Sequence, residues 1–309
     1  LGGGTFDVSV LELEDGIFEV KATKGNNKLG GIDFDKKLTD LIVKNFVDEH
    51  GIDLSKDRLA YHKIVGESEK AKQILSDINE VDINIPFITA NQDGIKDLSL
   101  TITRGQFEML IEEYIDETIS LMEDAISEAG FTKDDISEVI LVGGSTKIPL
   151  ITDKIERYIG KKVFKEVNPN EVVATGAAIQ GAILQAKIKG VVLVDVTPLS
   201  LGIEINRGLF VPVITRNSPI PTEAKKVFTT ISDNQDEVEI HILQGEGEYV
   251  SDNTSLGKFI LSGIRRAKKG EPRIEVCFDI DANSILKVSA VDLDTKESQK
   301  VIINSKINL

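Results

Sequence analysis

The first 187 residues alternate between two hydrophobic patterns. In segments 5–13 and 17–20, apolar and polar side chains alternate as in half-buried strands, and Asp15-Gly16 between them favours a hairpin turn. We expect a second turn at 24–28. The same alternation predicts two further strands, at 81–85 and 98–102.

Other segments carry apolar residues every three or four positions, as on the buried face of a helix. This spacing predicts three helices, at 34–46 ending at Gly51, at about 57–76, and at 107–126 closed by Gly130. The third helix begins with a capping box of Thr103 and Gln106. In the second helix we expect five apolar side chains to face inward: Leu59, Ile64, Ala71, Ile74 and Leu75.

Two later segments are apolar without a periodic pattern. Residues 139–142 (Val-Ile-Leu-Val) predict a strand covered on both faces, and a helix follows near Pro149. Residues 168–171 (Asn-Pro-Asn-Glu) predict the start of the next helix, with Pro169 at its first position. That helix, 172–183, is apolar all round, so we expect it to be buried.

Beyond Asp195 the helical pattern ends. Short apolar segments separated by turn residues predict an antiparallel sandwich, with strands at 210–214, 227–231, 238–243, 257–261, 274–278 and 285–290.

The stretch that joins these two parts is itself apolar. Four apolar residues, Val191 to Val194, lie between Gly190 and Asp195. Tethers between domains are normally polar, because exposed apolar surface is unfavourable in water. The segment is therefore either the buried first strand of the following domain or a connector that docks in one state of the protein.

Composition narrows the class of protein. The 309 residues are 41% hydrophobic and 28% charged, which is typical of a soluble globular protein with room for two domains. A net charge of −15 argues against nucleic acid as a partner. No apolar run has membrane-spanning length, which argues against a membrane partner. The single cysteine, Cys277, fits a cytoplasmic location, and the three histidines lack metal-ligand spacing.

Three glycine clusters are the candidate binding elements of the chain. Gly2-Gly3-Gly4-Thr5 opens the first hairpin, Gly30-Gly31 precedes a helix, and Gly143-Gly144-Ser145 links a predicted strand to a helix. Glycines let backbone N–H groups approach phosphate oxygens closely, and helix N-termini favour anions. Any one cluster is weak support, since most glycine pairs merely form turns, but the three together indicate phosphate and nucleoside contacts.

These clusters lie within motifs that resemble a known superfamily. L-G-G-G-T-F-D-V-S-V resembles the second phosphate motif of the actin, hexokinase and heat-shock chaperone superfamily, and I-L-V-G-G-S-T-K-I-P resembles its adenosine motif. The tether and D-V-T-P-L-S-L-G-I-E resemble the heat-shock protein 70 (DnaK) chaperones, as do F-D-I-D-A-N-S-I-L-K-V-S-A and other segments along the whole chain.

The resemblance implies an α/β actin-like ATPase fold, mainly its lobe II, followed by an antiparallel β-sandwich. It implies three domains: 1–187 as the rear part of a nucleotide-binding domain, 188–195 as the linker, and 196–309 as a peptide-binding domain. The chain begins at Leu1 directly before its glycines, so we expect an internal fragment of an ATPase that is deficient in ATP hydrolysis on its own.

The resemblance also implies residue roles for ATP or ADP with Mg²⁺. Asp7 would lie near the magnesium and the attacking water, no side chain would bind the metal directly, and Thr5 would be a site of autophosphorylation. Nucleotide contacts are implied for Gly2, Gly3, Gly4, Thr5, Gly30, Glu69, Lys72, Ser76, Gly143, Gly144, Ser145 and Lys147. Lys147 replaces the family's usual arginine, which weakens a planar contact with adenine, and Asn170 stands where an aspartate is common. A solvated helical pair is the alternative for Glu69 and Lys72.

For the second half, the resemblance implies a pocket for extended hydrophobic segments of unfolded proteins. The residues implied to line it are Ile203, Ile205, Phe228, Ile231, Val238, Ile240 and Ile274. Ordinary sandwich core is the alternative for these residues. Asn206 departs from the apolar residue that is commoner in the arch over the peptide. Val192, Leu193 and Asp195 would couple the two domains, and a J-domain co-chaperone and a nucleotide-exchange factor would be partners.

Two rival functions follow from the same residues. A kinase or filament protein would share the nucleotide core but would not explain a sandwich behind an apolar tether. A peptide-binding module with an inert nucleotide half would keep only the second activity.

Overall fold

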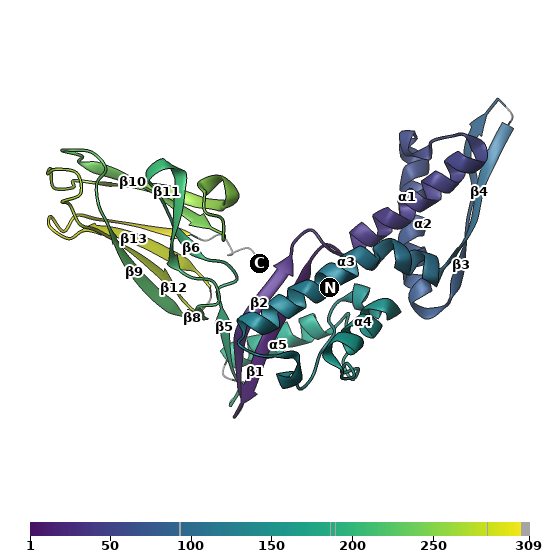
Figure 1. Ribbon diagram of the computed structural model, residues 1–309, viewed down its shortest axis with the longest axis horizontal. Coiled ribbons are helices and arrows are strands. Elements are labelled where there is room, and N and C mark those ends of the chain that lie inside the picture. The colour runs from purple at the N-terminus through teal and green to yellow at the C-terminus, as the bar shows by residue number, and fades with distance from the viewer. Residues whose placement is uncertain (93, 186, 189, 283, 304–309) are drawn as a thin grey trace. The chain divides into compact units, whose positions relative to one another are not determined.

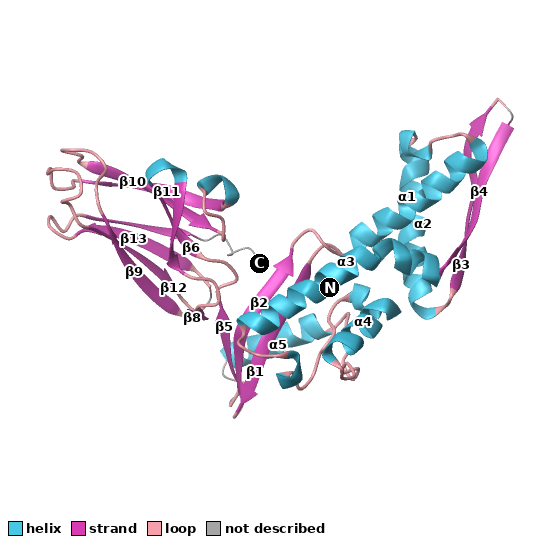
Figure 2. Cartoon of the chain, viewed as in Figure 1, coloured by secondary structure: helices cyan, strands magenta, loops and turns pink. Residues whose placement is uncertain are grey.

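The computed structural model describes residues 1–92, 94–185, 187–188, 190–282 and 284–303. The chain divides into two compact units, one formed by 1–8 and 24–189 and the other by 9–23 and 190–309. Helices dominate the first unit and strands the second (Figures 1 and 2). The predicted range 196–309 includes residues 304–309, which lie outside the described part of the chain.

The first unit is built from helices and a long hairpin. In chain order its elements are the start of β1 (Phe6–Glu14), the end of β2 (Ile17–Asn26), α1 (Gly31–His50), α2 (Arg58–Asp77), β3 (Glu80–Asn91), β4 (Gly94–Thr103), α3 (Arg104–Glu128), the short 3₁₀ turn η3 (Gly144–Lys147), α4 (Pro149–Ile159) and α5 (Val172–Leu184). Strand β2 runs through most of the turn expected at 24–28, and its ladder ends only at Asn26.

Capping residues explain where the helices begin and end. Thr103 and Gln106 form the predicted capping box of α3. Asp57 accepts hydrogen bonds from the amides of Leu59 and Ala60 at the start of α2. Gly51 ends α1 with a φ of 68°, a left-handed conformation that glycine adopts without strain.

The α1–α2 pair forms part of the first unit's core. The buried positions of α2 are Ala60, Ile64, Ser68, Ala71 and Leu75, a helical stripe that confirms three of the five predicted inward residues. The prediction is wrong for Leu59 and Ile74, which are 77% and 41% exposed. Each immediately precedes a buried residue and so points about 100° away from the stripe.

Two apolar segments of the first unit are more exposed than predicted. The segment 139–142 forms only an isolated bridge between Ile140 and Phe164, and Ile140 is 53% exposed. Helix α5 starts at Val172, so Pro169 does not open it, and Val173 and Ile179 are 66% and 45% exposed. Apolar composition predicts burial only when a partner surface covers the segment, and composition cannot identify that surface.

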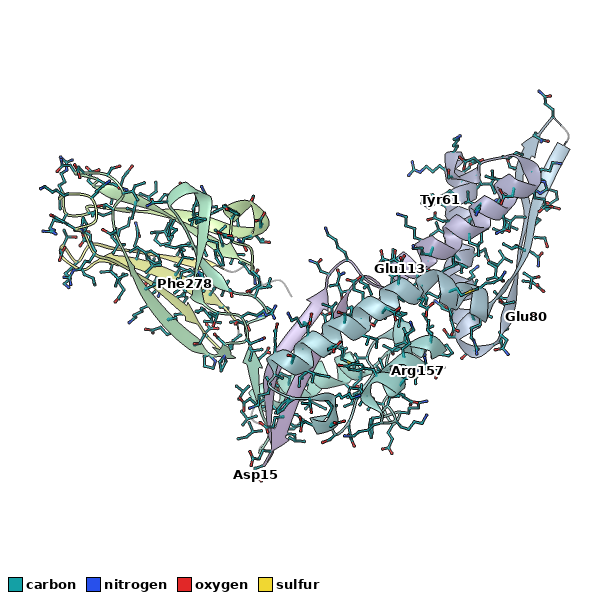
Figure 3. All side chains as sticks on the ribbon, viewed as in Figure 1. Asp15, Tyr61, Glu80, Glu113, Arg157 and Phe278 are labelled. Atoms are coloured by element: carbon teal, nitrogen blue, oxygen red, sulfur yellow. The ribbon has the colours of Figure 1, made fainter. Side chains whose placement is uncertain are left out.

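The second unit contains two four-stranded antiparallel sheets that share one core. One sheet has the order β11-β10-β6-β7 and the other β14-β13-β12-β9. The strands are β6 (Leu201–Ile205), β7 (Leu209–Ile214), β9 (Thr222–Phe228), β10 (Glu237–Gln244), β11 (Thr254–Ser262), β12 (Ile274–Ile280), β13 (Leu286–Asp292) and β14 (Ser298–Ile303). Phe278 is fully buried in this core, to which strands of both sheets contribute (Figure 3).

The strand predictions of the second unit miss the inner strand β6 and fail at two sheet edges. The segment predicted at 227–231 is instead β9, which ends at Phe228 and leaves Ile231 59% exposed. Strands β9 and β14 are the outer strands of their sheet and carry many polar residues. Edge strands commonly carry charges that prevent edge-to-edge pairing, so their hydrophobic pattern is weak.

The apolar connector forms a strand. Strand β5 (Val192–Val196) pairs in parallel with β2 through Ile17–Val192, Phe18–Leu193 and Glu19–Val194. On its other side it pairs with the two-residue strand β8 (Pro219–Ile220). Val192 and Leu193 remain 52% and 45% exposed. The alternative of a buried strand is therefore wrong for these two side chains.

Candidate functional site

The three glycine clusters of the sequence meet in the first unit. The carbonyl oxygen of Gly2 accepts hydrogen bonds from the Gly31 amide and from the Ser145 hydroxyl, each at 2.9 Å. The carbonyl of Gly3 accepts a third hydrogen bond from the Ile32 amide at 2.8 Å. Segments that are more than a hundred residues apart in sequence are thus joined around the first loop.

The glycines are required by close backbone approaches. A Cβ atom on Gly30 would lie 2.5 Å from the Gly4 nitrogen and 2.6 Å from the Gly3 carbonyl oxygen. At Gly143, where φ is 94°, a Cβ atom would lie 2.3 Å from the Leu1 carbonyl oxygen. Both distances are far below van der Waals contact, so neither position accepts a side chain without moving the loop.

The arrangement suits an anion. Gly3 and Gly4 are exposed, and within the described chain their amides donate to no protein acceptor. The Gly2 amide, by contrast, donates to the Thr5 carbonyl at 3.0 Å. The N-terminus of the 20-residue helix α1 adds its partial positive charge beside this loop. Free amides next to a helix N-terminus are a typical phosphate-binding arrangement.

A buried ion pair lies beneath the same loop. The Lys72 ammonium group lies 2.7 Å from the Asp35 carboxylate and donates to the Gly31 carbonyl at 2.9 Å. Both side chains are about nine-tenths buried. Burial raises the pKa of Asp35, and Lys72 opposes that rise. The second carboxylate oxygen of Asp35 is buried and has no hydrogen-bond partner among the described residues.

Sequence reasoning named Lys72 but missed Asp35. The available signal was its place on the buried face of α1, between Phe34 and Leu38. A carboxylate on such a face requires a partner, because an isolated buried charge is very unfavourable.

We expect Lys72→Met to lower the free energy of unfolding of the first unit by roughly 3 kcal/mol, because Asp35 would be left buried and unpaired. The double variant Lys72→Met/Asp35→Leu should recover most of this loss. Since the pKa of Asp35 is already raised in the fold, the loss of stability in the single variant should be smaller at low pH, where Asp35 is protonated, than at neutral pH. Urea unfolding at both pH values measures this, and equal losses in the single and double variants would contradict it.

The other predicted nucleotide residues are partly or fully exposed. Ser76 donates to the Lys72 carbonyl at 3.2 Å, and Glu69 is exposed about two turns before Ser76 on the same helix. Thr5, Asp7 and Lys147 are exposed. Asn170 lies next to Gly144, where a Cβ atom would be 3.1 Å from its side-chain oxygen.

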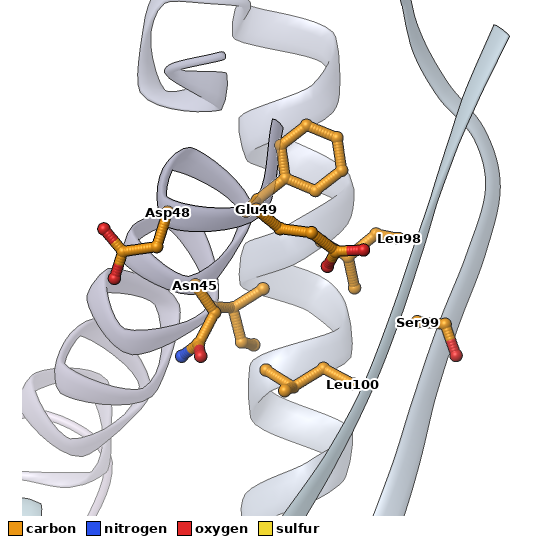
Figure 4. A pocket seen from close by; sticks show the side chains of 8 residues that line it. Asn45, Asp48, Glu49, Leu98, Ser99 and Leu100 are labelled. Atoms are coloured by element: carbon orange, nitrogen blue, oxygen red, sulfur yellow. The ribbon is translucent and has the colours of Figure 1, made fainter. Parts of the chain in front are cut away.

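A separate cleft of about 320 Å³ lies between α1 and β4. In Figure 4, Glu49 extends from α1 towards Leu98, whereas Asp48 points away from the strands. The lining residues are Ile42, Asn45, Phe46, Asp48, Glu49, Leu98, Ser99 and Leu100, and none of them is a predicted site residue. The candidate anion site is thus an open surface rather than this cleft.

The residues predicted to bind a peptide fall into two groups, one buried and one partly or fully exposed. Ile203, Ile240 and Ile274 are at most 4% exposed and belong to the core of the second unit. Ile205, Phe228 and Val238 are partly buried against that core, and Ile231 is exposed. The core alternative therefore describes the first three, whereas the other four keep part of their side-chain surface exposed.

Neither a bilayer span nor a metal cluster is found in the described residues. No described helix has the combination of length and apolarity required to cross a membrane. In the same part of the chain, no three His, Cys, Asp or Glu side chains group as metal ligands.

The mixed α/β content, the several sheets and the glycine-lined anion site are consistent with a nucleotide-binding protein of the actin-like ATPase type. A comparison with protein families matches residues 1–309 to the family described as Hsp70 protein. The chain belongs to this family. Its members are ATP-binding chaperones that act in protein folding, bind unfolded polypeptides and work with co-chaperones.

Proposed function

We propose that the chain belongs to an ATP-dependent chaperone in which nucleotide controls the binding and release of extended hydrophobic segments. The convergence of three glycine clusters around two free amides is the observation that carries this proposal. Residues 1–187 would bind nucleotide, 188–195 would connect, and 196–309 would form the peptide-binding sandwich. Family resemblance adds a cytoplasmic location, a role in the stress response and phosphorylation of Thr5.

The residues present fit ATP or ADP. The Gly3 and Gly4 amides would donate to phosphate oxygens, and Lys72, Ser76 and Glu69 would contact the nucleoside from α2. Gly143, Gly144 and Ser145 would close the adenosine side, and Asp7 would orient water near a phosphate-bound Mg²⁺. Bound Mg²⁺ would neutralise the phosphate charge, so the chain's own contribution would be positioning.

Titration calorimetry of this chain with MgADP and MgATP tests the nucleotide half of the proposal. We expect saturable binding that is abolished when the glycine loop is altered. Heat signals equal to those of buffer alone would contradict it.

The exposed apolar side chains of α5 favour one alternative for the isolated chain. Val173 and Ile179 present apolar surface that other protein would be expected to cover. The chain alone would then act as a peptide-binding module whose nucleotide half is inert. The same titration separates these functions, because the module would bind peptide and no nucleotide.

For peptide binding we propose the surface around Ile205, Phe228, Ile231 and Val238, with the three buried isoleucines as its floor. An extended segment would gain backbone hydrogen bonds from sheet edges and insert an apolar side chain between these residues.

Val238→Phe should fill this surface and weaken binding of a fluorescent leucine-rich peptide by at least about tenfold, since the loss of one buried side-chain contact is worth about 1.4 kcal/mol or more. The control is Val227→Phe on β9, which adds the same volume at a side chain that is 53% exposed. Fluorescence anisotropy measures both affinities. Equal affinity of Val238→Phe and the wild type, with an unchanged unfolding transition, would remove Val238 from the site.

A further inference from the structure

A buried histidine in the second unit links a carboxylate to a hydroxyl. The Nδ1 atom of His241 lies 2.7 Å from the Glu204 carboxylate, and its Nε2 atom lies 2.8 Å from the Ser255 hydroxyl. The His241 side chain is 9% exposed and the Glu204 side chain 35% exposed, whereas Ser255 is exposed. None of these residues has a part in the function proposed above.

Three neighbouring strands supply the three groups. Glu204 lies on β6, His241 on β10 and Ser255 on β11, which are adjacent in one sheet (Figure 1). The pairing of Ile242 with Ile203 places Glu204 directly opposite His241. The geometry is therefore fixed by sheet register rather than by a loop.

A bulge in β11 places Ser255 on the same face of the sheet as His241. The ladder pairs Lys258 with His241 and Gly257 with Ile242, but then Ser255 with Leu243, so Leu256 is the extra residue. Leu256 packs towards the core, and Ser255 and Lys258 share the opposite face although they are three residues apart. Gly257, with a φ of 150°, supplies the backbone conformation beside the bulge.

A neutral His241 can satisfy both of these hydrogen bonds. An ionised Glu204 only accepts, so Nδ1 of His241 carries the proton and donates to it. Nε2 then accepts from the Ser255 hydroxyl. This order of nucleophile, base and orienting carboxylate is the arrangement that activates serine for attack on acyl groups. Charged groups on this face of β10 and β11 include Lys258, opposite His241, Glu239, which pairs with Lys258 at 2.8 Å, and Glu237.

We propose that Ser255 is a nucleophile, activated by His241 and Glu204, that accepts an acyl group from esters with good leaving groups. The Ser255 oxygen attacks the carbonyl carbon while its proton moves to Nε2 of His241. The bond to the leaving group then breaks, the leaving group departs with the bonding electron pair, and His241 releases the proton to solvent. We restrict the proposal to a single transfer, because repeated turnover also requires donors for the oxyanion.

The test is acetylation of the purified chain by p-nitrophenyl acetate, followed by peptide mass mapping. We expect Ser255 to be acetylated about 100-fold faster than Ser251, whose hydroxyl, among the described residues, donates to the Asp252 carboxylate and has no histidine beside it. Ser255→Ala should abolish the adduct at that peptide, and Ser251→Ala should not change it. Acetylation of Ser255 no faster than Ser251 would overturn the proposal.

Two further variants test whether His241 and Glu204 activate Ser255 or whether Ser255 reacts only because it is exposed. His241→Gln and Glu204→Gln should slow acetylation of Ser255 by about tenfold or more while leaving the unfolding transition in place. An acetylation rate of Ser255 that is unchanged in His241→Gln would contradict base activation.

Discussion

Replacing Gly30 by alanine should weaken nucleotide binding by roughly 10- to 100-fold while the first unit stays folded. The new Cβ atom would lie 2.5 Å from the Gly4 nitrogen and 2.6 Å from the Gly3 carbonyl carbon and oxygen. These are backbone atoms, so the loop must move rather than a side chain. The backbone of Gly30 itself is extended, with φ at −172°, and accepts alanine without strain.

The size of the effect follows from the displaced amides. Among the described residues the Gly3 and Gly4 amides donate to no protein acceptor, and a hydrogen bond to a charged phosphate contributes roughly 1.5–3 kcal/mol. Loss of one such bond weakens binding by roughly 10- to 100-fold. Calorimetry with MgADP and MgATP would measure this as a correspondingly larger Kd.

Gly66→Ala is the matched control for Gly30→Ala. A Cβ atom on Gly66 would meet nothing within 4 Å, and Gly66 lies inside α2. Alanine there should leave nucleotide affinity unchanged and raise helix stability by roughly 1 kcal/mol. Wild-type affinity in Gly30→Ala would show that the loop is not the phosphate site.

Replacing Asp292 by alanine should destabilise the second unit by roughly 3 kcal/mol or more. The carboxylate is fully buried at the end of β13 and accepts hydrogen bonds from the amides of Arg265, Asp294 and Thr295 at 2.9, 2.7 and 3.3 Å. Truncation leaves these amides without their acceptor, and each unsatisfied buried donor costs about 1–3 kcal/mol.

The same carboxylate predicts a pH dependence. Burial alone would raise the pKa of Asp292, but the amide hydrogen bonds outweigh burial and lower it. A pKa that is lower in the folded state stabilises the fold above the unfolded-state value of about 3.9, and this contribution is lost as pH falls through the folded-state pKa. Stability should therefore fall more steeply in acid for the wild type than for Asp292→Asn.

Urea unfolding between neutral and acidic pH measures both effects. The control is Asp236→Ala, which removes a surface carboxylate paired with Arg266 and should change stability by less than about 1 kcal/mol. A similar small loss in Asp292→Ala would show that the three amides find other acceptors.

Local patterns predicted the elements that depend on neighbouring residues. The capping box at Thr103, the end of α1 at Gly51 and the strand segments 81–85 and 98–102 within β3 and β4 all follow from short-range chemistry. Burial of α5 was predicted wrongly because burial depends on a partner surface, which no local pattern encodes. The polar edge strands β9 and β14 were misplaced or missed for a related reason, since their outer positions carry charge.

The candidate sites also divide into residues that local sequence reveals and residues that only the fold brings together. Glycine clusters are visible in the sequence, and the structure brings Gly2, Gly31 and Ser145 into contact. Asp35 was not predicted as a site residue because its role depends on the ion pair with Lys72, which the sequence does not reveal. Ser255 and His241 meet through a bulge, and a one-residue shift in register cannot be found from residue alternation.

The measurement that tests the central claim most directly is the release rate of a bound peptide with ATP and with ADP. It is made on an intact chaperone that carries this chain, with Asp195→Asn as a companion because Asp195 would anchor the docked connector. We predict release 5- to 150-fold faster with ATP, as for a coupling of about 1–3 kcal/mol, and a smaller acceleration in Asp195→Asn at unchanged peptide affinity. Equal release rates with the two nucleotides would contradict the proposed control of peptide binding by nucleotide.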